Sequence, residues 1–169
     1  MYSKELIKFA LTLSDKAVMS AIDKAVDVST VFPTPTGGCH PLWVLGHLTM
    51  IEGTVPAILY GEENPVAHWK HLFGEGSEPV PNANAYPTFT QIRERYSEFR
   101  ERTLSILDSL REEDLDRPTK APPKGREREF ATFGSSLLVI ALHQCIHRAH
   151  VMDALRAAGR VEVPVAAAN

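Results

Sequence analysis

Two histidines four residues apart, His143 and His147, lie in the apolar segment LLVIALHQCIHRAHVMDALRA. Four residues make just over one helical turn, so both imidazoles project from the same face of a helix. Histidine is the commonest nitrogen ligand of zinc and related metals. A third histidine, His47, lies in the apolar segment PLWVLGHLTMIEG. If the two segments pack together, three imidazoles converge on a metal site with an open coordination position, as a catalytic metal requires.

The histidine pair taken alone is a weak signal, because a core or surface histidine with a hydrogen-bond partner is the commoner explanation of such a pair. The residues that precede His143 are apolar, which predicts that its ring points into the protein. A neutral imidazole buried there needs a polar partner, and few polar side chains are near it in sequence. The zinc-protease signature has glutamate directly after the first histidine, whereas Gln144 stands here, so a peptidase of that kind is not predicted.

Other candidate residues surround this pattern. His150 falls on the same helical face and is a candidate fourth ligand, hydrogen-bond partner or acid–base catalyst; the alternative is a histidine facing water. Cys39 precedes a helix, whose dipole would favour a thiolate and make it a candidate reactive thiol. Cys145 is turned away from the histidine face and is interpreted as a packing residue. His68 and His71 are interpreted as surface residues of a long connection; the alternative is that this connection folds over the site.

Length and composition indicate one globular domain over residues 1–169, with 44% hydrophobic and 23% charged residues. The net charge of -3 does not indicate a nucleic-acid partner. Glu52, Gln144 and Arg148 interrupt the apolar segments before they reach the ~20 residues of a membrane span. The N-terminal segment lacks a signal-peptide pattern, and the two cysteines form no disulfide framework, so a cytoplasmic protein is expected.

Helical periodicity dominates the chain, and no strand pattern competes with it. A long connection rich in Gly, Pro, Asn and Glu covers residues 61–87, and a polar, proline-rich loop precedes the last helix. Pro56 is expected to kink or end the second helix. The prediction is an all-α four-helix bundle with a long crossover between helices 2 and 3. The expected helices cover approximately residues 3–26, 41–61, 88–110 and 133–158.

Four segments of the sequence resemble the DinB/YfiT-like family of metal-dependent four-helix-bundle proteins. They are HPLWVLGHLTMIEG, YPTFTQIRERYSEF, SLREEDLDRPT and LHQCIHRAHVMDALRAAG, and together they span most of the chain. The resemblance implies a bundle of unusual connection, often a homodimer, with a divalent metal held by His47, His143 and His147. Relatives include transferases that use small cellular thiols and an isomerase.

Two classes of function follow from these patterns. The first is a metal-dependent enzyme with one zinc or nickel ion per chain, which activates a low-molecular-weight thiol for transfer or water for hydrolysis. The second is a non-catalytic, stress-related protein that binds a metal or a small molecule. The sequence names no substrate.

Overall fold

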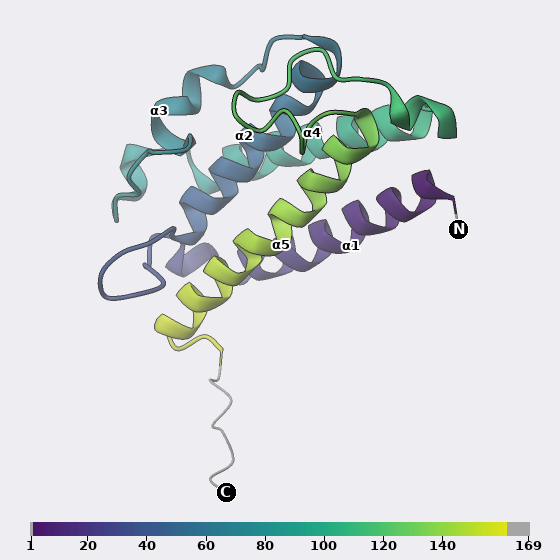
Figure 1. Ribbon diagram of the computed structural model, residues 1–169. Coiled ribbons are helices and arrows are strands. Elements are labelled where there is room, and N and C mark those ends of the chain that lie inside the picture. Colours follow the sequence, from purple (N-terminus) through teal and green to yellow (C-terminus); the bar gives the residue numbers. More distant parts are fainter. Residues whose placement is uncertain (1, 162–169) are drawn as a thin grey trace, which may run out of the picture.

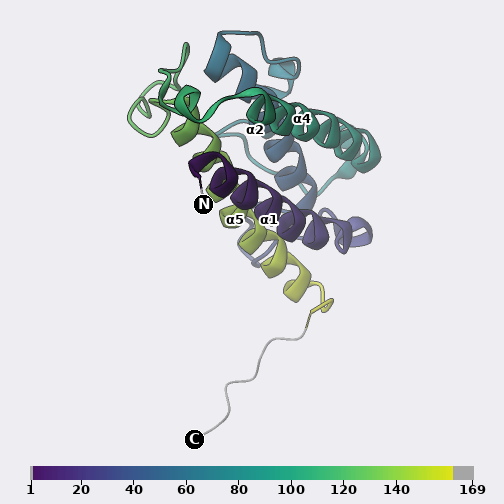
Figure 2. The same ribbon diagram turned by 90° about the vertical axis from the view of Figure 1, so that its right-hand side faces the viewer.

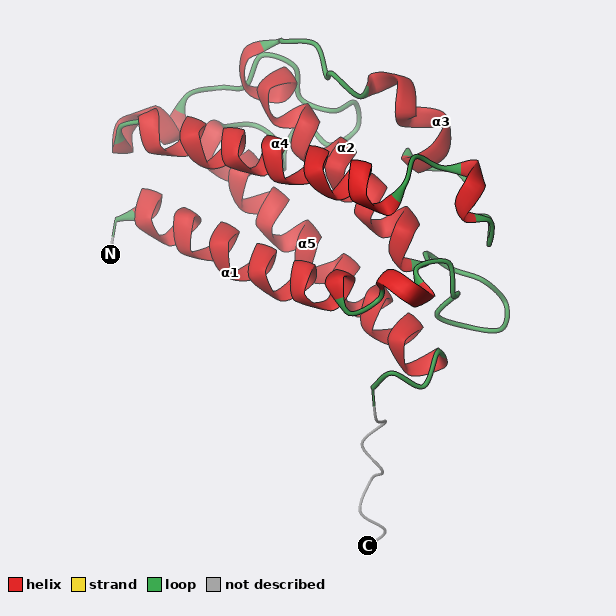
Figure 3. Ribbon diagram, turned by 180° about the vertical axis from the view of Figure 1, so that it is seen from behind, coloured by secondary structure: helices red, strands yellow, loops and turns green. Residues whose placement is uncertain are grey.

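The computed structural model describes residues 2–161, and this part of the chain is helical and contains no strand (Figure 3). The all-α prediction is therefore confirmed. Short 3₁₀ turns cover Val26–Val28, Ala67–Trp69, Ala83–Ala85 and Glu112–Asp116. The α-helices are α1 (Ser3–Asp23), α2 (Pro41–Tyr60), the short α3 (Lys70–Phe73), α4 (Phe89–Ser109) and α5 (Phe133–Ala157).

The helix ends follow local chemistry that the sequence displays. Pro41 occupies the first position of α2, and the backbone N–H of Trp43 donates to Nδ1 of His40 at 3.1 Å. Thr88 and Gln91 form the capping box expected at the start of α4. Gly61 ends α2 in the left-handed conformation, with φ of 76°, which a residue with a Cβ adopts at a cost.

Of the kink or early end expected at Pro56, the early end does not occur, because α2 continues to Tyr60. Val55 and Leu59, which flank this proline, are 2% and 0% exposed, so tertiary packing outweighs the local penalty of the missing donor. With a mean hydropathy of 1.4, α2 is long and apolar enough to cross a membrane. However, 78% of that window is buried inside the protein, which identifies α2 as the core helix of the bundle.

The four long helices form two parallel pairs that run in opposite directions. Figures 1 and 2 show α1 beside α5, and α2 beside α4. Ser14 of α1 contacts Gln144 of α5, and Glu52 of α2 contacts Arg100 of α4. Because α2 and α4 run in the same direction, the connection that joins them, residues 61–88, must return along the length of the bundle (Figure 1).

The bundle contains two apolar cores, separated by a buried polar layer. One core lies at the end where α2 begins, and the other at the end where α2 finishes. Representative residues of the first core are Val18, Ile22, Leu45, Leu48 and Val151, and of the second Leu11, Leu59, Leu107, Leu137 and Ile140.

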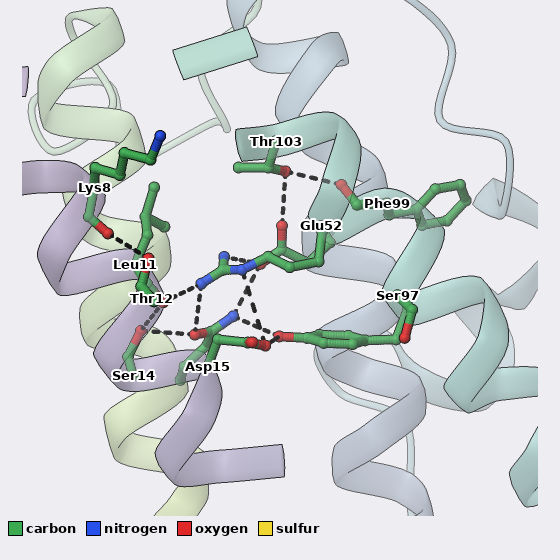
Figure 4. A network of polar contacts seen from close by, with 12 residues as sticks. Lys8, Leu11, Thr12, Ser14, Asp15, Glu52, Ser97, Phe99 and Thr103 are labelled. Carbon is green, nitrogen blue, oxygen red and sulfur yellow. Dashed lines mark hydrogen bonds and ion pairs between the residues drawn. The ribbon is translucent and has the colours of Figure 1, made fainter. Parts of the chain in front are cut away.

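The buried polar layer joins all four long helices (Figure 4). Glu52 lies at its centre and is 1% exposed. Arg100 donates to Glu52 Oε1 at 2.7 Å, and Gln144 Nε2 donates to the same oxygen at 2.9 Å. Gln144 also donates to the Tyr96 hydroxyl at 2.8 Å, which in turn donates to Asp15 at 2.6 Å. The layer therefore fixes the face that α2 presents to α5, and with it the direction of the histidines on these helices.

Candidate metal centre

The three histidines predicted as ligands converge between α2 and α5. His47 lies on α2, and His143 and His147 lie one turn apart on α5. One nitrogen from each ring lies within 4.8 Å of the other two, and the Nε2 atoms of His47 and His143 are 2.9 Å apart. Nitrogen ligands about 2.1 Å from a tetrahedral metal lie about 3.4 Å from one another. Small movements of the rings thus suffice to hold one ion.

Two contacts orient the His47 ring. Its Nδ1 lies 2.7 Å from the carbonyl oxygen of Phe73, so an Nδ1–H donates there and the Nε2 lone pair faces the other histidines. The Trp43 ring stacks on the imidazole at a centroid distance of 4.8 Å and an angle of 9°. Phe73 approaches because residue 46 is glycine: a Cβ there would lie 2.3 Å from the Phe73 ring. The crossover thereby supplies a backbone partner that positions the ring.

The electrostatics keep the imidazoles neutral, which is the form that binds a metal. Burial, and then the neighbouring His47 and Arg126, lower the pKa of His143 to about 4. Burial, and then the two other histidines of the cluster, lower the pKa of His147 to about 2. The buried Nδ1 of His147 has no hydrogen-bond partner among residues 2–161. A convergent, neutral, all-nitrogen donor set with a buried nitrogen lacking a partner fits a divalent transition metal.

His150 lies beside this cluster and outside its three convergent nitrogens. Its ring meets that of His147 edge-on at a centroid distance of 5.3 Å, and its own Nδ1 is buried without a partner in the described part of the chain. The predicted fourth ligand is therefore not among the convergent group. A role of His150 in catalysis stays a prediction.

The other candidate residues named from the sequence lie outside the three-histidine cluster. Cys39 lines the cavity beside the histidines, but burial raises the pKa of its thiol, so the thiolate expected from the helix dipole is not favoured. Cys145 is exposed rather than packed in the core, and it lies outside the cluster. His68 and His71 are exposed on the crossover, as predicted.

A cavity of about 460 Å³ opens onto all three histidines, and we call it the histidine chamber. Trp43 and Met50 form part of its wall, and two charged side chains, Glu75 and Arg126, also line it. Sequence reasoning missed both charged residues, because each lies in a polar loop among similar residues. Only the folding of these loops over α2 and α5 singles them out.

An all-α bundle that gathers three neutral imidazoles beside a cavity fits a metal-binding protein. Residues 14–151 match the DinB superfamily, and the chain belongs to this superfamily. The matched range includes the three histidines and all of the buried polar layer. No curated protein matches the chain.

Proposed function

We propose that the protein is a metal-dependent enzyme that activates a small thiol for transfer, or water in a related hydrolysis. The observation that carries this proposal is the convergence of three neutral imidazoles at the wall of a cavity large enough for a small molecule. A purely structural metal site has all its positions closed by protein ligands, whereas three ligands beside a cavity leave one position for substrate.

The donor set favours zinc or nickel, with one ion per chain. A metal bound there would supply a Lewis acid that lowers the pKa of a thiol or water ligand. The protein's own residues would position the reactants. His47 is held by the Phe73 carbonyl and by Trp43, and the carboxylate of Glu75 lines the same cavity, where it can accept the proton that the nucleophile releases.

The metal site is tested by elemental analysis of the purified protein after exposure to zinc or nickel. We expect about one ion per chain, and loss of that ion in a His143→Ala/His147→Ala double variant. His68→Ala/His71→Ala is the matched control, because it removes two exposed histidines of the crossover and should keep full metal content. Full metal in the cluster variant would exclude the site.

Turnover separates the enzyme from the non-catalytic binding protein. A panel of small thiols, each with an electrophilic acceptor, and a panel of esters are assayed with and without metal. A rate that requires the metal, and that the cluster variant lacks, supports the enzyme. Stoichiometric metal with no turnover of any thiol or ester would instead support a protein that binds a metal or small molecule without catalysis.

We further propose a cytoplasmic homodimer. The two cysteines are free, which suits a reducing compartment. The adjacent helices α1 and α5 carry large apolar side chains that are 52–59% exposed. A second copy of the chain offers the same apolar side chains and can cover them by twofold symmetry. The residues of this apolar face are Leu6, Phe9, Leu13, Leu142 and Ile146.

A further inference from the structure

A second chamber, of about 310 Å³, adjoins the histidine chamber, and we call it the side chamber. Five residues line both, among them Ile51, Thr54 and His143. His143 thus stands where the two chambers meet. A ligand that occupies the side chamber can therefore extend to the three histidines.

The walls of the side chamber are apolar. Every residue that lines it without also lining the histidine chamber has an apolar side chain. Water gains few hydrogen bonds from such walls, so an apolar ligand group displaces it favourably. Representative residues are Ala57 and Ile58 of α2, Val139 and Ile140 of α5, and Pro123 and Phe130 of the loop before α5.

Backbone hydrogen bonds hold the outer wall in place. The carbonyl oxygen of Ile58, in the last turn of α2, accepts from the N–H groups of Lys120 and Ala121 at 3.0 and 3.1 Å. The N–H of Thr119 donates to the carbonyl of Ala131 at 3.1 Å, which closes the base of the loop. The loop is thereby tied to the last turn of α2 and closed at its own base, so the chamber is formed without a ligand.

Two charged side chains line the junction of the chambers. The guanidinium of Arg126 lies over the Phe130 ring, 5.0 Å from its centroid. Within residues 2–161, neither Arg126 nor Glu75 uses its charged group in a hydrogen bond or an ion pair. A planar guanidinium with its donors free and its position supported by an aromatic ring is suited to bind a carboxylate.

We propose that the side chamber binds the apolar body of the substrate, an aryl or alkyl group, and that Arg126 binds a carboxylate on the same molecule. The reacting group of that molecule then lies at His143, on the histidine chamber. This assignment rests on the proposed function for the reaction, but binding to the side chamber is measurable without turnover.

Binding is tested with three probes of one shape: 4-phenylbutyrate, its neutral amide and 4-phenylbutylamine. Isothermal titration gives the affinities, and NMR of the isoleucine methyl groups reports whether Ile58 and Ile140 sense the phenyl ring. We expect the carboxylate to bind about tenfold more tightly than the amide, as one charge-assisted hydrogen bond implies. Tighter binding of the amine would assign the junction to Glu75 and overturn the role of Arg126.

Two kinds of variant separate the parts of the proposal. Arg126→Gln should reduce carboxylate binding to that of the amide, whereas Arg128→Gln, an exposed arginine of the same loop that lines neither chamber, should change nothing. Ala57→Phe should fill the side chamber and abolish binding of all three probes. Ala121→Trp, at an exposed loop position, serves the same purpose with less risk to folding. Unchanged binding in both filled variants would exclude the side chamber.

Metal content of every variant distinguishes this proposal from the proposed function. Full metal occupancy together with no probe binding overturns the side chamber alone. Probe binding that follows the predicted order in a protein that holds no metal supports the side chamber while the proposed enzyme fails.

Discussion

Removing Arg100 should strongly destabilise the protein, because it leaves the carboxylate of Glu52 buried without its counter-charge. The two side chains are 5% and 1% exposed, and the guanidinium is 2.7 Å from the carboxylate. Loss of one partner of such a buried ion pair costs about 3–5 kcal/mol. We therefore expect Arg100→Met to lower the free energy of unfolding by about this amount at pH 7, measured by urea denaturation followed by far-UV circular dichroism.

The matched control is Arg102→Met, on the same helix. Arg102 pairs with Glu62 at the surface, where the two side chains are 44% and 46% exposed, and such pairs contribute about 0–1 kcal/mol.

The loss of stability in Arg100→Met should also depend on pH. Burial raises the pKa of Glu52 above its ordinary value, opposed by Arg100 and the Thr103 hydroxyl.

Without Arg100, only the Thr103 hydroxyl opposes the effect of burial, and the pKa of Glu52 in the folded protein rises further above its value in the unfolded chain. Stability then rises as the pH falls through the raised pKa, so the loss in Arg100→Met should be smaller at pH 5 than at pH 7. Adding Glu52→Gln to the Arg100→Met variant should also recover stability. Equal losses in the Arg100 and Arg102 variants, or a loss unchanged between the two pH values, would refute the reasoning.

Three further predictions concern the site and the assembly. Gly46→Ala would place a Cβ 2.3 Å from the Phe73 ring and displace the carbonyl that orients the α2 histidine, so metal affinity should fall about 10–100-fold in competition with a chelating dye. Because the pKa values of His143 and His147 are lowered to about 4 and about 2, these two rings stay neutral in the metal-free folded protein at pH values where they take up protons in the unfolded chain. Thermal stability should therefore fall as the pH is lowered from 6.5 to about 4, and a variant lacking both rings should show a flatter profile. Ile146→Glu should convert the proposed homodimer to monomers near 18.7 kDa by light scattering, whereas a wild-type mass already at that value would contradict the dimer.

Much of the fold could be predicted from the sequence, because helices and their ends depend on neighbours in the chain. The Thr88–Gln91 capping box and the glycine stop at Gly61 are set by hydrogen bonds and backbone preferences within a few residues. The pairing of His143 with His147 on one face is equally local, since it needs only a helix. Pro56 shows the limit of such reasoning, because burial of its neighbours keeps α2 helical.

The sequence by itself thus determined the four long helices, the shared face of the α5 histidines and, through the set of three histidines, a hypothesis of convergence. Only the tertiary structure decided that His47 meets its partners, because α2 and α5 must be fixed in register by a polar layer whose members lie far apart in the chain. It also decided that a backbone carbonyl, that of Phe73, orients the ring. No side-chain type marks such a contact, since every residue has a carbonyl. The same holds for Arg126, whose place at the junction of two chambers depends on how its loop is tied to α2.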